Sequence, residues 1–211
     1  MPETRRPGKR AAQAQETRRR ILEAARDMFV ADGYGATNLQ DVAARAGVAI
    51  QTIYYVFGTK RNLLKVLVDV TIAGDDQPLA TMERPWFTAA MATATAGEHL
   101  RAHVSGTRPI LERVAPIARV LDGAVAADPE ISVLWPQDTD PRHTVQSAAA
   151  RALMAKPGAR PDVSPEHAAD LLYGLLSPEV FTLFVERRNW SPDAWERWAH
   201  DTLRHQLTTG T

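Results

Sequence analysis

Residues 39–60 read LQDVAARAGVAIQTIYYVFGTK, and this stretch decides the predicted fold. Its first part has an apolar face at helical spacing, made by Leu39, Val42, Ala43 and Ala46. Gly47 ends this helix, because a residue without Cβ readily takes the left-handed conformation at a helix end. Residues 49–56 form a second short helix, with Val48 buried in the turn. Two short helices joined by a glycine turn are typical of a DNA-binding helix-turn-helix.

A longer helix over residues 16–32 precedes this motif. Its apolar stripe consists of Ile21, Leu22, Ala25, Met28 and Phe29. Gly33 supplies its stop signal, and Gly35 makes the link to the next helix short. That next helix begins after either Thr37, with Gln40 three places on, or Asn38, with Asp41, since both pairs can form a cap.

The first fifteen residues, MPETRRPGKRAAQAQ, hold two prolines and four basic residues without apolar periodicity. We expect a flexible arm over residues 1–15. Such an arm either enters a minor groove beside the bound motif or contacts nothing.

Composition narrows the class of protein. The chain has 211 residues, 45% of them hydrophobic, which is enough for a proper core. It has no cysteine, which excludes disulfides, thiolate nucleophiles and cysteine-based zinc sites. No apolar run reaches the length of a membrane span, and no secretion signal opens the chain, so we expect a cytoplasmic protein without membrane contact.

The net charge of zero hides an asymmetry along the chain. Through Val68 there are 12 Lys and Arg against 6 Asp and Glu, whereas 13 and 19 follow. The basic first third is therefore the part expected to meet a polyanion.

Residues 16–64, with GYGATNLQDVAARAGVAIQTIYYVFGTKRNLL at their centre, resemble the DNA-binding domain of the TetR family of bacterial regulators. The resemblance rests on the glycine turn, the Thr-Ile-Tyr of the second short helix, the aromatic Phe57, and Thr-Lys before a Leu-Leu pair. It implies an all-α fold: a helix-turn-helix domain over residues 16–62 and a helical effector-binding and dimerisation domain over residues 63–211.

The resemblance also implies which residues meet DNA: Ala49, Ile50, Gln51, Thr52, Tyr54, Tyr55, Thr59 and Lys60. Gln51 is the best candidate base reader, because its amide can pair with adenine N6 and N7. Tyr54 is expected on DNA, whereas Tyr55 serves either DNA or packing. Lys60 is expected to face a phosphate, and Arg45 and Arg61 are weaker candidates.

Two positions depart from the family's usual pattern. Ala49 stands where many members have Ser or Thr, so the second short helix lacks a side-chain cap. Val56 replaces a residue that is often polar, so one phosphate contact is absent.

Beyond the motif the pattern stays helical. We predict helices over residues 61–73, 85–95, 97–114, 116–126, 141–155, 164–176, 177–188 and 191–206. Three of them begin with a serine cap followed by proline, at Ser164, Ser177 and Ser191. No alternating strand pattern appears.

The resemblance implies that the last helices form a homodimer and that the body encloses a small molecule. The region from Leu171 to Phe184 is apolar enough for a dimer interface, although some of its aromatic residues would fill the core. Candidate pocket residues have aromatic or soft side chains, as suits an apolar effector: Trp86, Met91, His103, Trp135 and Tyr173. His99 and His103 have no third ligand nearby, so no metal site or other cofactor is predicted.

These features predict a ligand-responsive transcriptional regulator, a repressor that a small apolar molecule releases from a pseudo-palindromic operator. An architectural DNA-binding protein without an effector is the alternative. An all-α enzyme is a further one, but no nucleophile–base pair, carboxylate pair or phosphate loop supports it, and no catalytic residue is assigned.

Overall fold

The computed structural model describes residues 9–75, 80–134 and 140–209, and the chain is 82% helical. Those ranges contain no β-strand, which confirms the all-α prediction. The chain divides into two compact units, Met1–Asp69 with Ile117–Leu134 and Val70–Pro116 with Trp135–Thr211. We call them unit 1 and unit 2.

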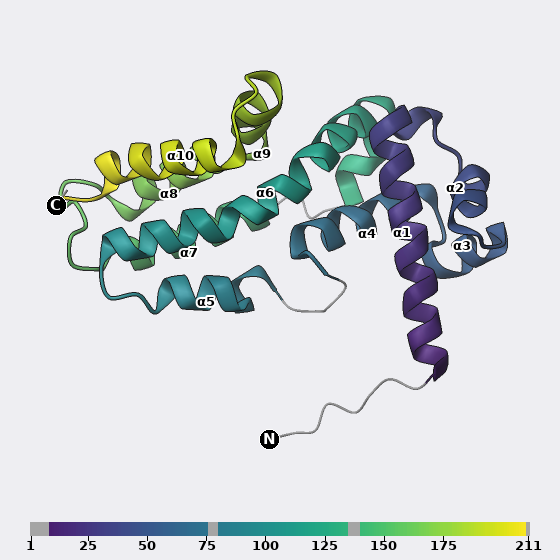
Figure 1. Ribbon diagram of the computed structural model, residues 1–211, viewed down its shortest axis with the longest axis horizontal. Coiled ribbons are helices and arrows are strands. Elements are labelled where there is room, and N and C mark those ends of the chain that lie inside the picture. The colour runs from purple at the N-terminus through teal and green to yellow at the C-terminus, as the bar shows by residue number, and fades with distance from the viewer. Residues whose placement is uncertain (1–8, 76–79, 135–139, 210–211) are drawn as a thin grey trace. The chain divides into compact units, whose positions relative to one another are not determined.

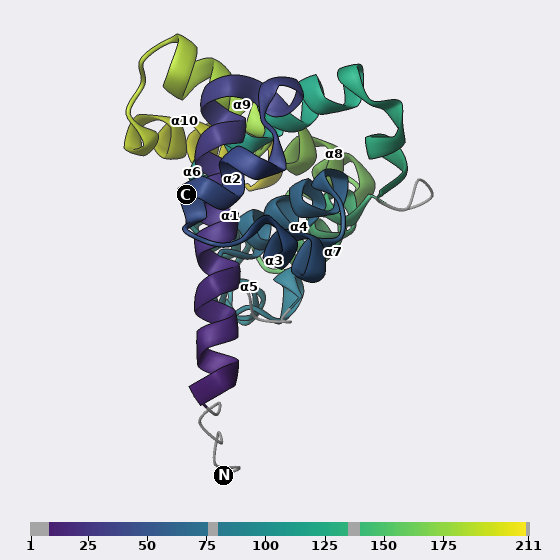
Figure 2. The same ribbon diagram turned by 90° about the vertical axis from the view of Figure 1, so that its right-hand side faces the viewer.

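Unit 1 holds the predicted DNA-binding motif. Its helices are α1 (Lys9–Ala36), α2 (Leu39–Ala46), α3 (Ile50–Phe57) and most of α4 (Lys60–Ala73) (Figure 1). Figure 2 looks toward α2 and α3, which lie beside the longer α1. The end of α6 (Ala96–Ala127) and the short helix η2 (Pro129–Leu134) complete the unit. Its core is made by large apolar side chains that are fully buried: Ile21, Phe29, Ile53, Leu63, Leu64, Ile117 and Ile131.

The N-terminal helix starts earlier than the sequence predicted. Helix α1 begins at Lys9, so residues 9–15, which we had expected in a flexible arm, are helical; residues 1–8 lie outside the described residues. Three alanines among residues 9–15 favour a helix even without an apolar stripe. The predicted stop lies inside these bounds: Gly33 has φ 82° and ψ 160°, a non-helical conformation that only glycine adopts easily, so α1 is interrupted there before its last turn ends at Ala36.

The start of α2 settles the choice between two caps. Asn38 is the N-cap, and its side chain accepts a hydrogen bond of 2.9 Å from the backbone N–H of Asp41. Thr37 instead donates its hydroxyl to the carbonyl of Gly33 at 2.9 Å. Gly47 ends the helix with φ 65° and ψ 41°, as the motif requires.

Unit 2 packs its helices around one hydrophobic core. They are η1 (Thr81–Glu83), α5 (Pro85–Met91), the first part of α6, α7 (Pro141–Met154), α8 (Pro165–Leu175), α9 (Pro178–Phe181), the π-helix η3 (Thr182–Arg187) and α10 (Pro192–Leu207). In Figure 1, the axes of α5, α7, α8 and α10 are roughly aligned with that of the first part of α6, although the chain runs along them in both directions. The core contains Leu100, Leu153, Leu172 and Trp195, none of which has exposed surface.

The three predicted serine caps are all present. Ser164, Ser177 and Ser191 each accept a hydrogen bond from the backbone N–H three residues on, and each is followed by proline at the first helical position.

Four predicted helices have clearly different boundaries. The predicted helices over residues 97–114 and 116–126 are one continuous helix, α6, which contains Pro109 and Pro116. Proline usually ends or kinks a helix, so a break before Pro116 was the natural expectation. Helix α5 ends at Met91 rather than residue 95, and the predicted helix over 177–188 changes from α to π at Thr182.

In the described part of the chain, no single helix is long and apolar enough to cross a membrane. One pair, Pro165–Leu175 and Pro178–Arg187, meets the length and composition test only together and with a bend of 42°. Leu172 and Phe181 of this pair are buried in the core of unit 2.

Candidate nucleic-acid interface

Helix α3 has a buried face and an exposed face. Ile53 and Phe57 anchor it in unit 1, with 0% and 2% of their surface exposed. On the other side Gln51 is exposed, and Tyr54 and Tyr55 expose 55% and 92% of theirs. Ile50 and Thr52 are half-buried, and Ala49 is exposed at the start of the helix. A tyrosine as exposed as Tyr55 has no packing role within the protomer, which leaves its side chain available to a partner.

The start of α3 has no side-chain cap. Ala49 is the N-cap residue, with φ −71° and ψ 145°, and only its carbonyl takes part, accepting from the N–H of Thr52 at 2.9 Å. This is what the alanine led us to expect. Val48, which we had expected to be buried in the turn, is half-buried.

The loop after α3 is held by Thr59 and Asn62. The Thr59 hydroxyl accepts from the N–H of Asn62 at 3.1 Å, so Thr59 caps α4. The Asn62 side chain donates to the carbonyl of Phe57 at 2.8 Å and thereby ties the end of α3 to the start of α4. The role of Asn62 was not predicted, although a polar residue in the first turn of a helix is a common capping signal.

Lys60 and Arg18 rest on aromatic rings of unit 1. The Lys60 ammonium lies 4.2 Å from the centre of the Tyr34 ring, and burial lowers the pKa of Lys60. The Arg18 guanidinium lies 5.2 Å from the centre of the Phe57 ring. Lys60 is therefore positioned by Tyr34, a partner that sequence reasoning did not identify.

The two weaker candidates for DNA contact form ion pairs inside unit 1. Arg45 lies 2.7 Å from a carboxylate oxygen of Asp27. Arg61 donates to both carboxylate oxygens of Asp128, at 2.5 and 3.1 Å, and also pairs with Glu130. These hydrogen bonds lower the pKa of Asp128. Arg61 therefore joins α4 to the segment after α6 within the same unit.

In unit 2, two of the predicted effector residues meet. The ring centres of Trp86 and His103 are 5.9 Å apart, and Trp86 lies so close to α6 that a Cβ on Gly106 would be 2.2 Å from its Cε3 atom. Met91 is partly buried against the same core. Tyr173 lies on α8, where its hydroxyl donates to Asp140 at 2.7 Å. Trp135 lies outside the described residues.

Two buried histidines lie on α6. His103 is 1% exposed, and its Nε2 lies 2.8 Å from the side-chain oxygen of Gln146. His99 is fully buried, neither of its ring nitrogens has a hydrogen-bond partner among the described residues, and burial lowers its pKa to about 4. In the same part of the chain, no group of three side chains is arranged to hold a metal ion.

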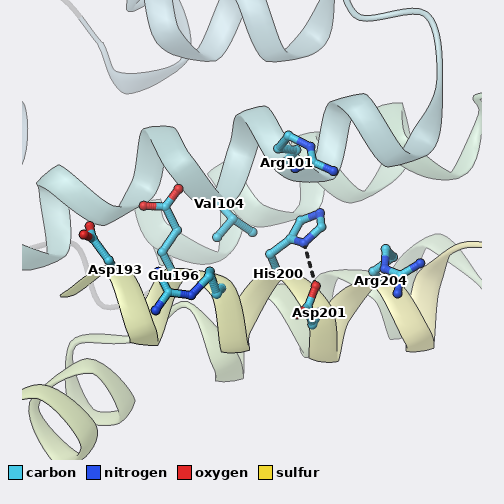
Figure 3. A pocket seen from close by; sticks show the side chains of 8 residues that line it. Arg101, Val104, Asp193, Glu196, His200, Asp201 and Arg204 are labelled. Carbon is cyan, nitrogen blue, oxygen red and sulfur yellow. Dashed lines mark hydrogen bonds and ion pairs between the residues drawn. The ribbon is translucent and has the colours of Figure 1, made fainter. Parts of the chain in front are cut away.

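A cavity of about 590 Å³ opens elsewhere in unit 2, between α6 and α10 (Figure 3). Charged side chains line most of it, and none of the predicted effector residues is among them. Its α10 residues Arg197, His200 and Arg204 recur at helical spacing, a pattern visible in the sequence. The opposing Arg101 comes from α6, and sequence spacing could not have placed it there.

Comparison with known proteins now gives the family. Residues 21–67 match the family described as bacterial regulatory proteins, tetR family. A solved TetR-family regulator from Mesorhizobium loti is 18% identical, and the match covers 93% of this chain and 99% of that one with a TM-score of 0.70. The helix-turn-helix of this chain is a TetR-family DNA-binding domain.

Other relatives match this chain over stretches of different length. The regulator SrpR of Pseudomonas putida is 36% identical over 81 residues, which are 37% of this chain and 38% of SrpR. The regulator TtgR of the same species is 44% identical over 57 residues, which are 27% of each chain. The chain thus spans well under half the length of these two relatives. A Saccharomonospora viridis regulator solved with choline is 21% identical, with a TM-score of 0.68 and coverage of 92% of this chain and 98% of that one.

The two kinds of similarity cover different lengths of the chain. The family match covers residues 21–67, whereas the likeness of the whole chain to solved structures is a likeness of fold. The roles of the individual residues in DNA and effector binding stay predictions.

Proposed function

We propose that this protein is a transcriptional repressor of the TetR family that binds a pseudo-palindromic operator as a homodimer and is released by a small apolar molecule. The observation that carries the proposal is the division of α3 into two faces. Ile53 and Phe57 fix the helix, while Gln51, Tyr54 and Tyr55 point their polar groups away from the core. A short helix with this arrangement can enter a major groove and present side chains to base edges.

Affinity and specificity have different sources in this interface. Gln51 is the residue suited to reading a base, whereas the two tyrosines and Lys60 suit phosphates. Apolar Ala49 and Ile50 leave few other polar groups at the start of α3. Much of the affinity should therefore depend on phosphate contacts and on the spacing of two recognition helices in a dimer.

Unit 2 offers surface for the dimer. Leu183 exposes 44% of its surface, and beside it Phe184, Trp190 and Trp198 are only partly buried. The Phe184 ring centre lies 4.5 Å from that of Trp190 and 4.6 Å from that of Trp198. Aromatic residues left partly exposed near the C-terminus suit burial against a second copy.

For the effector, the region around Trp86, Met91 and His103 is the proposed site, with Tyr173 and Trp135 as further candidates. It combines aromatic surface with the Nδ1 atom of His103, which is buried and has no hydrogen-bond partner among the described residues. Among the structural neighbours, NalD of Pseudomonas aeruginosa is named a repressor of a multidrug efflux pump, and the S. viridis regulator was solved with choline. A repressor and a small-ligand complex among proteins of the same fold favour repression and a small ligand here.

The test is binding of the full chain to the DNA that flanks its own gene, measured by fluorescence anisotropy at several salt concentrations. Gln51→Ala should weaken binding about 5- to 150-fold at the operator, equivalent to about 1–3 kcal/mol. Gln206→Ala, on an exposed position of α10, is the matched control and should bind as wild type. The proposal is refuted if the protein shows no sequence-selective binding to this DNA. It is also refuted if selective binding survives in the double variant with Gln51→Ala and Tyr54→Ala.

The effector is tested separately. A thermal-shift screen identifies molecules that raise the melting temperature, and each is then added to the protein–operator complex. Ligands that stabilise the protein and release DNA support the repressor. Specific DNA binding that no stabilising ligand changes would instead favour the architectural alternative.

A further inference from the structure

The cavity between α6 and α10 has a polarised charge distribution. Figure 3 shows Asp193 and Glu196 at one end and Arg101 and Arg204 at the other, with His200 pointing from α10 toward Arg101. All of these residues belong to unit 2. The two ends differ in whether their charges are already neutralised.

The acidic end is satisfied by a cation of the protein itself. Arg108, on α6, donates to Asp193 at 2.5 Å and to Glu196 at 2.9 Å. It also bonds to Glu112 at 2.8 Å. The carboxylates at this end therefore have no need of a bound cation.

The basic end has no such neutralisation. Arg101 and Arg204 line this end, and neither forms an ion pair with a carboxylate among the described residues, although Asp201 also lines the cavity. His200 adds a further group: its Nδ1 lies 3.1 Å from Asp201, which as a carboxylate can only accept, so Nδ1 carries the proton. The other ring nitrogen, Nε2, is buried and has no partner in the part of the chain that the structure describes; without a proton it can accept a hydrogen bond from a hydroxyl group of the ligand but cannot donate one to a carboxylate.

We propose that this end of the cavity is a binding site for a small organic oxyanion, a carboxylate or a phosphate. Planar guanidinium groups bind such anions through paired N–H donors, and guanidiniums from two helices can approach one anion from both sides. A cavity of about 590 Å³ is large enough for a metabolite-sized molecule. The site is distinct from the apolar region around Trp86, and its ligand is of a different chemical class.

The proposal is tested by isothermal titration calorimetry of the full-length protein without DNA. The probes are inorganic phosphate and citrate, each compared with sodium chloride at the same ionic strength, which separates specific binding from charge screening. We expect saturable binding of at least one probe. If only phosphate binds, the site prefers a phosphate, and if only citrate binds, it prefers a carboxylate.

Two variants and a control assign the binding to the cavity. Arg101→Gln and Arg204→Gln should each weaken the probe on the order of tenfold, the loss expected for one charge-assisted hydrogen bond. Arg151→Gln removes an exposed arginine of α7 and should bind as wild type. Circular dichroism checks that each variant is folded.

Two results overturn the proposal. One is a heat of titration for both probes that does not differ from that of sodium chloride. The same result is expected if a second copy of the chain covers the cavity. The other is probe binding that both variants retain. Because no DNA is present, neither result bears on the proposed repressor function, and loss of operator binding would not affect the anion site.

Discussion

Replacing Ala49 by serine should stabilise the recognition helix. Ala49 already has the extended backbone of an N-cap residue, φ −71° and ψ 145°, close to that of the serine cap Ser191, φ −69° and ψ 150°. At Asn38 the side-chain oxygen accepts from the third N–H of its helix at 2.9 Å, whereas α3 has no side-chain cap. A serine hydroxyl at position 49 would lie near the corresponding N–H groups of Gln51 and Thr52.

The gain is set by the value of one cap. Exchanging alanine for serine at an N-cap contributes about 0.5–2 kcal/mol, typically about 1. The gain is at the low end here, because the N–H of Thr52 already bonds to the Ala49 carbonyl at 2.9 Å. A gain of about 0.5 kcal/mol raises the melting temperature by about 1–2 °C in a chain of this size. It also lowers the population of the locally opened α3 roughly twofold.

Amide hydrogen exchange of α3 and urea unfolding followed by circular dichroism measure these effects. Ala44→Ser is the matched control: it places serine on the exposed side of α2, inside a helix, where serine is less favourable than alanine by up to about 0.5 kcal/mol. Opposite signs for the two variants are expected. If Ala49→Ser leaves the exchange of α3 unchanged or accelerates it as Ala44→Ser does, the cap argument is wrong.

Three further predictions concern stability. Gly106→Ala places a Cβ 2.2 Å from Cε3 of Trp86 and should lower the unfolding free energy measured in urea by about 1–3 kcal/mol. Gly97→Ala, on the same helix but with open space at the Cβ position, should be neutral or stabilising. Equal effects of the two substitutions would contradict the contact between Gly106 and Trp86. His99→Leu should reduce the loss of stability on acidification. The buried imidazole of His99 has a pKa of about 4, below its ordinary value near 6.5, so the unfolded chain binds the proton at a higher pH than the folded chain does. The wild-type protein should therefore lose up to about 3 kcal/mol of unfolding free energy as the pH falls from 6.5 to 4. A wild-type unfolding free energy that falls no faster than that of His99→Leu over this range would count against it. Asp128→Asn should destabilise unit 1 at pH 7, because Arg61 lowers the pKa of Asp128 and the ionised carboxylate stabilises the folded state above its unfolded pKa. The difference from wild type should shrink as the pH falls through the lowered pKa of Asp128, and a difference that acidification leaves unchanged would rule out the ion pair as its source.

Local signals in the sequence predicted local structure well. Gly33, Gly47 and the Ser-Pro pairs at Ser164 and Ser177 act on the backbone within a few residues, so their effects do not depend on the rest of the fold. The missing cap at Ala49 could be predicted for the same reason.

Contacts between distant residues could not be predicted in this way. Arg61 and Asp128 are separated by 67 positions, and Trp86 meets Gly106 and His103 only after α5 folds against α6. The cavity likewise needs Arg101 from one helix and Arg204 from another. The continuity of α6 through Pro116 depends on packing that outweighs the local preference for a break.

The composition of unit 1 has a consequence for engineering. The family match ends at residue 67, yet the unit also contains Ile117–Leu134, where Ile117 and Ile131 are buried and Asp128 holds Arg61. A chimera that exchanges only residues 1–69 with a relative would combine the relative's helix-turn-helix with this protein's own segment Ile117–Leu134, which packs against it. We therefore expect operator specificity to be transplanted most cleanly when both segments move together, so the transferable module is discontinuous in sequence.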